Sequence, residues 1–153
     1  MPGRTMPHEE LVEFLTAQPA RTAKLATVRE DGRPHVAPVW FNLDRAAATP
    51  ESPLGDIVFT TPAASVKGRA LRREARAALC VDDDRLPYSY VSIEGEAALS
   101  QDPDEVLHWA MAGARRYMPA DRAEETARGI AGLGAMAVRI RPTHIVALAE
   151  LAD

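Results

Sequence analysis

The chain has only one cysteine, Cys80, among its 153 residues. A single thiol excludes an internal disulfide, and a thiol with no neighbouring ligands gives no metal site. The apolar run at residues 77–81 predicts a buried strand around it, so we interpret Cys80 as a structural thiol and not as a nucleophile. No metal is expected.

Long apolar runs are also absent, and none is long enough to span a bilayer. The first 18 residues carry an arginine, a histidine and three glutamates, unlike the apolar stretch of a signal peptide. The formal net charge of −4 argues against general binding to nucleic acid or to a membrane surface. We therefore expect a cytoplasmic protein with neither kind of partner.

Lysine is nearly absent, since Lys24 and Lys67 stand against sixteen arginines. Lys67 begins a segment, residues 67–76, in which five side chains are basic although the whole chain is acidic. Ser65 is a candidate N-cap of a short helix there, and the N–H groups and positive dipole end of that helix favour a bound phosphate. The segment indicates an anion site. The alternative is a solvated helix whose arginines serve solubility and surface ion pairs.

The sequence has no glycine-rich phosphate loop and no alternation of strands with helices, which disfavours the parallel-sheet nucleotide folds. Instead, about six short strands follow one another with antiparallel links. This pattern predicts one α+β domain over residues 1–153, mainly β: a small closed antiparallel barrel with outer helices. Strands are expected at residues 23–28, 35–43, 56–61, 76–82, 88–99 and 135–148, and helices at 7–16, 65–76 and 102–128, the last divided at Pro119.

Two local signals refine this prediction. Asp31-Gly32, between the first two strands, is typical of a hairpin turn. Pro38 lies inside the second strand, and proline there is confined to an edge, a bulge or a backbone that faces something other than a strand. A backbone that faces a ligand and an ordinary edge strand both satisfy that rule.

Several segments, taken in order, resemble the pyridoxamine 5′-phosphate oxidase-like split β-barrel superfamily. They are residues 31–41 (DGRPHVAPVWF), 57–61 (IVFTT), 67–73 (KGRALRR), 81–83 (VDD) and 88–95 (YSYVSIEG). The resemblance covers about residues 8–148 and is closest to the group that uses the deazaflavin coenzyme F420 in place of FMN. It implies a six-stranded antiparallel split β-barrel and a homodimer, with the cofactor in a groove at the dimer interface.

The resemblance also implies roles for the basic segment. Lys67, with Ser65 and Arg69, matches the positions that hold the cofactor phosphate. Ser65, Arg69 and Arg72 fall at i, i+4 and i+7, so one helix face would present a track for the anionic oligoglutamate tail of the deazaflavin. Ala70 departs from the family pattern, which usually has asparagine there, so one polar contact to the cofactor is in question.

Further site residues follow from the same resemblance. The strands beside the tricyclic ring are matched by Pro38, Val39, Trp40, Thr60 and Thr61. Tyr88 and Tyr90 match positions that reach the groove from the partner subunit. Both tyrosines are therefore candidates for the proton donor, although an interface tyrosine also has a structural role to fill.

The implied activity is hydride transfer from the reduced deazaflavin to an unsaturated small organic acceptor such as an enone, a quinone or a tetrapyrrole. Such a cofactor supplies the hydride itself, so the protein needs few catalytic side chains, and no Ser-His-Asp set or metal-ligand spacing competes. An FMN-dependent oxidase or reductase of the pyridoxamine 5′-phosphate oxidase type is the first alternative. A non-catalytic protein that binds a flavin or haem is the second.

Overall fold

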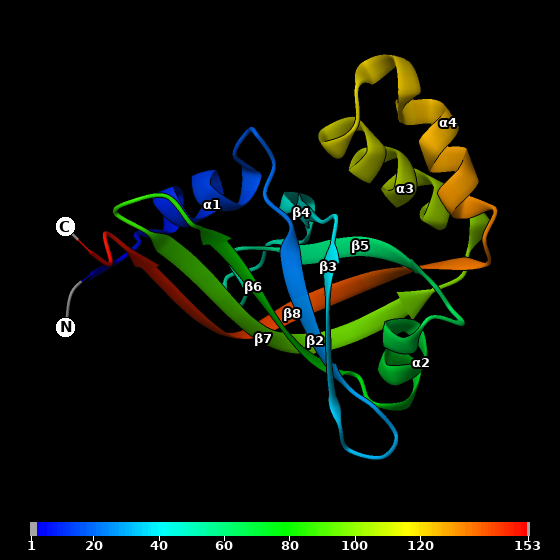
Figure 1. Cartoon of the computed structure of the whole chain (residues 1–153), viewed down its shortest axis with the longest axis horizontal. Helices are drawn as coiled ribbons and strands as arrows, with labels where there is room; N and C mark the ends of the chain where they lie inside the picture. The colour runs from blue at the N-terminus through cyan, green and yellow to red at the C-terminus, as the bar shows by residue number, and fades with distance from the viewer. Residues whose placement is uncertain (1–2, 153) are drawn as a thin grey trace.

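The computed structural model describes residues 3–152 and places eight strands in one antiparallel sheet, in the order β3-β2-β6-β7-β8-β5-β4, with β1 paired to β8 (Figure 1). The strands are β1 (Arg4–Thr5), β2 (Ala23–Val28), β3 (Pro34–Val39), β4 (Asn42–Asp44), β5 (Asp56–Pro62), β6 (Arg76–Asp83), β7 (Ser89–Ser100) and β8 (Ala135–Ala149). The helices are α1 (His8–Thr16), α2 (Val66–Arg73), α3 (Pro103–Tyr117) and α4 (Ala120–Ala131), with a 3-10 turn at Arg45–Ala47.

The α+β class and the antiparallel sheet are confirmed, but the expectation of a closed six-stranded barrel is wrong. The segment 35–43 was expected as one strand. Instead the chain leaves β2 after Val39 and pairs again only as β4, against β5 on the other side of the sheet. Trp40 and Phe41 link the two strands without pairing to any. Because β3 and β4 are the two ends of the strand order and only two residues join them, the sheet curls until its edges approach without bonding.

Alternation in the strands places the core inside this curl. In β2 the residues Ala23, Leu25 and Thr27 are buried while their neighbours are not, as a period of two requires. Phe41 and Phe59 are among the largest fully buried side chains. Cys80 is half-buried on β6, the strand that the sequence predicts. Burial and, to a smaller extent, the nearby Asp82 raise the pKa of its thiol.

Helix α2 begins as its sequence predicts. Ser65 is the N-cap, and its Oγ accepts a hydrogen bond from the Gly68 amide at 3.0 Å. Gly68 itself packs against the turn that leaves β5. A Cβ at this position would lie 2.8 Å from the carbonyl oxygen of Ala63 and closer still to that of Pro62. The start of α2 therefore fits tightly onto the end of β5.

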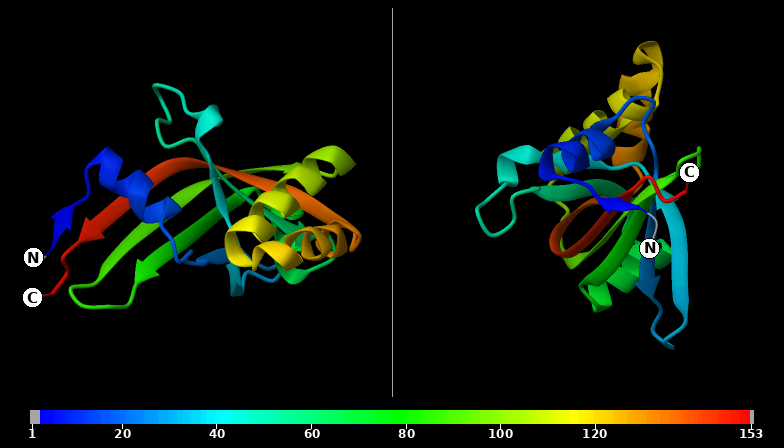
Figure 2. Two further views of the ribbon diagram at one scale, coloured as in Figure 1. Left: turned by 90° about the horizontal axis from the view of Figure 1, so that it is seen from above. Right: turned by 90° about the vertical axis from the view of Figure 1, so that its left-hand side faces the viewer.

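Helices α3 and α4 form a pair between β7 and β8, and the chain breaks between them at Pro119 as predicted. They pack through small side chains and lie at the end of the molecule away from both termini (Figure 2). Within residues 3–152, no helix combines the length and apolar character needed to cross a bilayer. The buried residues at the contact between the two helices are Ala110, Ala114, Ala123 and Ala127.

Candidate functional site

A cleft of about 260 Å³ lies between the end of β3 and the end of β5, two strands that do not pair with each other. Beyond β4, which pairs with residues 56–58, β5 has no strand on its β3-facing side, and β3 is paired only with β2. The first turn of α2 and the α3–α4 pair complete the walls. The lining residues are Pro38, Val39, Trp40, Thr60, Thr61, Pro62, Lys67, Trp109, Ala110, Gly113, Ile130 and Leu133.

The cleft brings together six residues that the sequence assigns to a cofactor site, from three separate segments. Pro38 lies on an edge strand, which confirms that interpretation of the proline, and it also lines the cleft. That its backbone faces a ligand stays a prediction. Lys67 enters from the first turn of α2. Trp40 is 37% exposed and belongs to the cleft wall and not to the buried core.

Two of the predicted hydroxyls are already committed within the chain. Thr61 is 1% exposed, and its Oγ1 lies 3.1 Å from the Oγ of Ser65. Ser65 Oγ also donates to the Pro62 carbonyl at 2.8 Å while it caps α2. Ser65 therefore fixes the end of β5 to the start of α2. Thr60, by contrast, is half-buried, and the hydrogen bonds described for residues 3–152 include none from its side chain.

The basic residues of α2 divide between two grooves. Lys67 lines the cleft, whereas Arg69 lines a second groove of about 500 Å³ together with Arg29 and Arg73. The division follows from helix geometry, because Lys67 and Arg69 are two positions apart and such residues point about 200° apart around the helix axis. Arg73 also donates to the Val28 carbonyl oxygen, which holds α2 against the β2–β3 hairpin. Arg72 is exposed and lines neither groove.

Tyr88 and Tyr90 lie elsewhere in the single chain. Tyr90 pairs with Leu148 near the end of β8, while Thr60 pairs with Ala137 near its start. Those eleven steps along β8 correspond to roughly 35 Å of extended strand. Tyr88 precedes β7, adopts a positive φ of 64° and is 42% exposed. Neither tyrosine lines the cleft of its own chain.

The helical wall is the part that the sequence reasoning missed. The pattern at residues 102–128 predicts only a helix, and no local signal marks the loop residue Leu133, yet Trp109 and Leu133 both line the cleft. Leu133 is 68% exposed. The local sequence pattern does not indicate that α3 and α4 pack over the end of β5.

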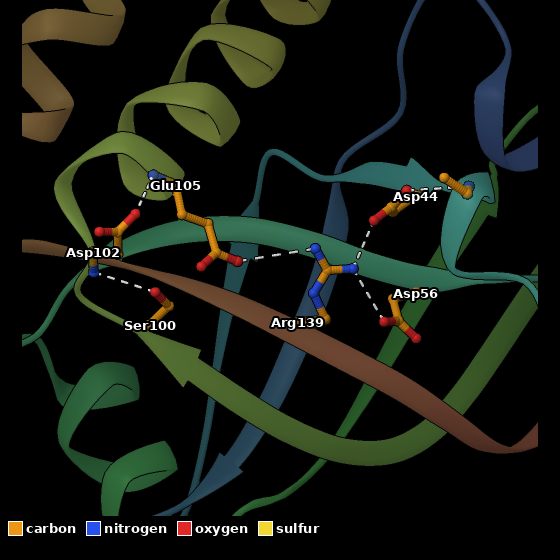
Figure 3. A network of polar contacts seen from close by, with 7 residues as sticks. Asp44, Asp56, Ser100, Asp102, Glu105 and Arg139 are labelled. Atoms are coloured by element: carbon orange, nitrogen blue, oxygen red, sulfur yellow. Dashed lines mark hydrogen bonds and ion pairs between the residues drawn. The ribbon is translucent and has the colours of Figure 1, made fainter.

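Charged residues behind the cleft fix this wall to the sheet. Arg139 on β8 lies 5.5 Å from the centre of the Trp109 ring. The same guanidinium binds Asp44 and Asp56 (Figure 3). Burial lowers the pKa of Arg139, but the hydrogen bonds to the two carboxylates outweigh it and leave the pKa raised. In the described part of the chain, no three His, Cys, Asp or Glu side chains gather as a metal ion would need.

A family model described as pyridoxamine 5′-phosphate oxidase matches residues 7–146, so the chain belongs to this family. The curled, unclosed sheet is its split β-barrel, a fold that binds flavin-type cofactors. No curated protein has significant sequence similarity to the chain.

Solved structures agree on the fold. A conserved hypothetical protein, Rv2991 from Mycobacterium tuberculosis, is 25% identical with a TM-score of 0.74, over 95% of this chain and 86% of that chain. A protein described as an F420 reductase is 26% identical with a TM-score of 0.62, over 87% of this chain and 94% of that chain. HutZ, a haem storage protein from Vibrio cholerae, is 17% identical with a TM-score of 0.69, over 92% and 94% of the two chains, a likeness of fold alone.

Proposed function

We propose that the chain is a deazaflavin (coenzyme F420)-dependent oxidoreductase that transfers a hydride from the reduced cofactor to an unsaturated small organic acceptor. One observation carries the proposal most directly. Residues from β3, β5 and α2 that resemble a cofactor site are far apart in sequence, and they line one cleft.

The residues of the cleft fit such a cofactor. The ammonium of Lys67, beside the start of α2, offers a charge and a positive dipole end for a phosphate. As an edge strand, β3 has backbone groups that no other strand pairs, and these can hydrogen-bond a ring edge. Trp40 and Trp109 give apolar walls that exclude water. When bound, the deazaflavin supplies the hydride, and the chain binds and orients it.

The second groove favours the deazaflavin over FMN. Its lining, on the far side of α2 from Lys67, has three arginines (Arg29, Arg69 and Arg73) against two acidic residues (Glu30 and Asp31), and this excess of positive charge would suit an anionic tail that continues past the phosphate. FMN has no such tail. The F420 reductase with 26% identity supports the same choice.

A second copy of the chain would complete the site. The cleft, at about 260 Å³, is smaller than the 300–1,000 Å³ typical of small-molecule sites. In the homodimer that we propose, Tyr88 and Tyr90 of one chain would reach the cleft of the other, and one of them would be the proton donor. Tyr88 is 42% exposed and so is accessible for such a contact.

A side-by-side titration of the purified protein with F420 and with FMN tests the proposal. We expect tighter binding of F420 than of FMN. We also expect a quinone to oxidise reduced F420 without oxygen, measured as the loss of the absorbance of reduced F420. Tight FMN binding with oxygen consumption would replace the proposal with an FMN-dependent oxidase. Tight cofactor binding without turnover of any acceptor would indicate a carrier or storage protein.

A further inference from the structure

Tyr117, the last residue of α3, stacks on the exposed tryptophan of the cleft. Its ring and that of Trp40 have centroids 5.3 Å apart and planes within 2° of parallel. Tyr117 itself does not line the cleft. Its ring reaches the cleft through Trp40, which lines the cleft and is 37% exposed.

The hydroxyl of Tyr117 fixes the backbone on which Trp40 is carried. It donates a hydrogen bond to the carbonyl oxygen of Arg21 at 2.6 Å and accepts one from the amide of Phe41 at 3.3 Å. Burial raises the pKa of this phenol, which keeps it protonated as a donor. Arg116, the preceding residue, donates to the Phe41 carbonyl at 2.6 Å and to the Leu15 carbonyl at 2.7 Å.

These contacts matter because the sheet does not hold this part of the chain. Trp40 and Phe41 form the link between β3 and β4, and neither belongs to a strand. The amide and the carbonyl of Phe41 are bound by side chains of α3 where a sheet would have used a neighbouring strand. The orientation of the Trp40 indole thus depends on the end of α3.

We propose that Tyr117 is a positioning residue for substrate binding: it fixes the plane of the Trp40 indole and with it the width of the cleft for a flat, conjugated acceptor. The part that concerns the acceptor rests on the proposed oxidoreductase function. The part that concerns the indole does not, because it follows from the stacked pair alone.

The chain offers a clean spectroscopic test, because it has two tryptophans and Trp109→Phe leaves Trp40 as the only one. In that background, Tyr117→Phe keeps the stacked ring and loses the hydroxyl bonds, while Tyr117→Leu loses both. Phe14→Leu is the matched control, since it removes a half-buried aromatic ring from α1 that does not line the cleft. Tyr117→Met serves as a second variant should Tyr117→Leu not fold.

We expect Tyr117→Leu to raise the acrylamide quenching of Trp40 fluorescence and to lower its anisotropy. Tyr117→Phe should stay near the parent protein, and so should Phe14→Leu. In the wild-type background, Tyr117→Leu should raise KM for a quinone about fivefold with kcat within about twofold, because a stacking wall worth about 1 kcal/mol binds ground and transition states alike.

Unchanged quenching and KM in a folded Tyr117→Leu or Tyr117→Met protein would overturn the proposal. So would equal effects of Phe14→Leu, since the changes would then report only lost stability. If the wild-type protein does not bind F420, the proposed function fails, but the quenching comparison still decides whether Tyr117 positions Trp40.

Discussion

Arg139 in the first third of β8 and Asp56, the first residue of β5, form an ion pair of 3.1 Å, and the Asp56 side chain is only 4% exposed. The same guanidinium binds Asp44 of β4 at 2.7 Å and lies 4.0 Å from Glu105 in the first turn of α3 (Figure 3). One arginine therefore holds three strands and a helix together directly behind the wall of the cleft.

Removal of this arginine should destabilise the fold. Arg139→Met leaves the buried Asp56 carboxylate without its cation, and breaking a buried pair in this way costs about 3 kcal/mol. Urea unfolding followed by circular dichroism measures the change. Arg141→Met on the same strand is the control, because Arg141 is exposed and forms no ion pair with the residues that the structure describes. Equal stabilities of the two variants would contradict the role of Arg139.

Gly68→Ala should disturb the start of α2. The added methyl group would meet the carbonyl oxygens of Pro62 and Ala63, which are backbone atoms and cannot move aside cheaply. We expect a lower melting temperature and weaker cofactor binding, because Lys67 precedes this residue in the cleft wall. Gly129→Ala in α4 is the matched control, since a methyl group there meets no neighbour within 4 Å. A fully stable Gly68→Ala protein would show that the turn after β5 adapts.

Stability should fall in acid partly through Asp83. The side-chain hydrogen bond from Arg85, with further contributions from its backbone amide and from Arg21, lowers the pKa of this carboxyl from 3.8 to about 2. The ionised group therefore stabilises the fold above its ordinary pKa, and this contribution disappears as the pH falls through about 2. Asp83→Asn should lower stability at pH 7 and flatten its dependence between pH 4 and pH 2, measured by thermal unfolding. An unchanged slope in this variant would refute the assignment.

Lys67→Ala should weaken binding of both F420 and FMN, because each presents a phosphate to the cleft. Loss of a charge-assisted hydrogen bond typically costs about 1.5–3 kcal/mol. Lys24→Ala is the control: this lysine is exposed on β2 and paired with Asp82 at 2.9 Å. Fluorescence quenching titrations compare the two, and equal affinities would remove Lys67 from the site.

Arg69→Gln should affect the two cofactors differently. Arg69 lies in the second groove and not beside Lys67, so it should contribute to the tail of F420 and little to the phosphate. We expect weaker F420 binding with a smaller dependence on salt, and nearly unchanged FMN binding. Titrations at low and high ionic strength provide the measurement. An equal loss for both cofactors would place Arg69 at the phosphate instead.

The fold was largely predictable from local signals. Alternation in β2, the Asp31-Gly32 turn, the Ser65 cap and the break at Pro119 each act over a few residues, and each is confirmed. The break after Val39 was not predictable, because residues 35–43 continue to favour a strand. The strand is interrupted because residues 42–44 pair with β5 and not with β2.

The candidate site was predictable in part for a similar reason. Residues of β3, β5 and α2 carry recognisable local patterns, and the structure brings them together. The separation of Lys67 from Arg69 follows from helical geometry and was open to prediction. The contributions of Trp109 and Leu133 depend on how two helices pack over a distant strand, so they are not contained in local sequence. The roles implied for Tyr88 and Tyr90 need a second chain and stay a prediction.

The α3–α4 pair leaves and rejoins the sheet at one point, since Ser100 at the end of β7 pairs with Ala137 near the start of β8. The two helices are thus inserted between paired residues of β7 and β8, and contacts of Glu105, Arg116 and Tyr117 fix α3 to the rest of the fold. A segment of another length between Ser100 and Ala137 would leave the paired ends of β7 and β8 in place, but it would remove the contacts that α3 makes with Trp40 and Phe41. Variation in this one segment would therefore change the helical wall of the cleft, at Trp109 and Leu133, without changing the strands that carry Pro38 and Thr60.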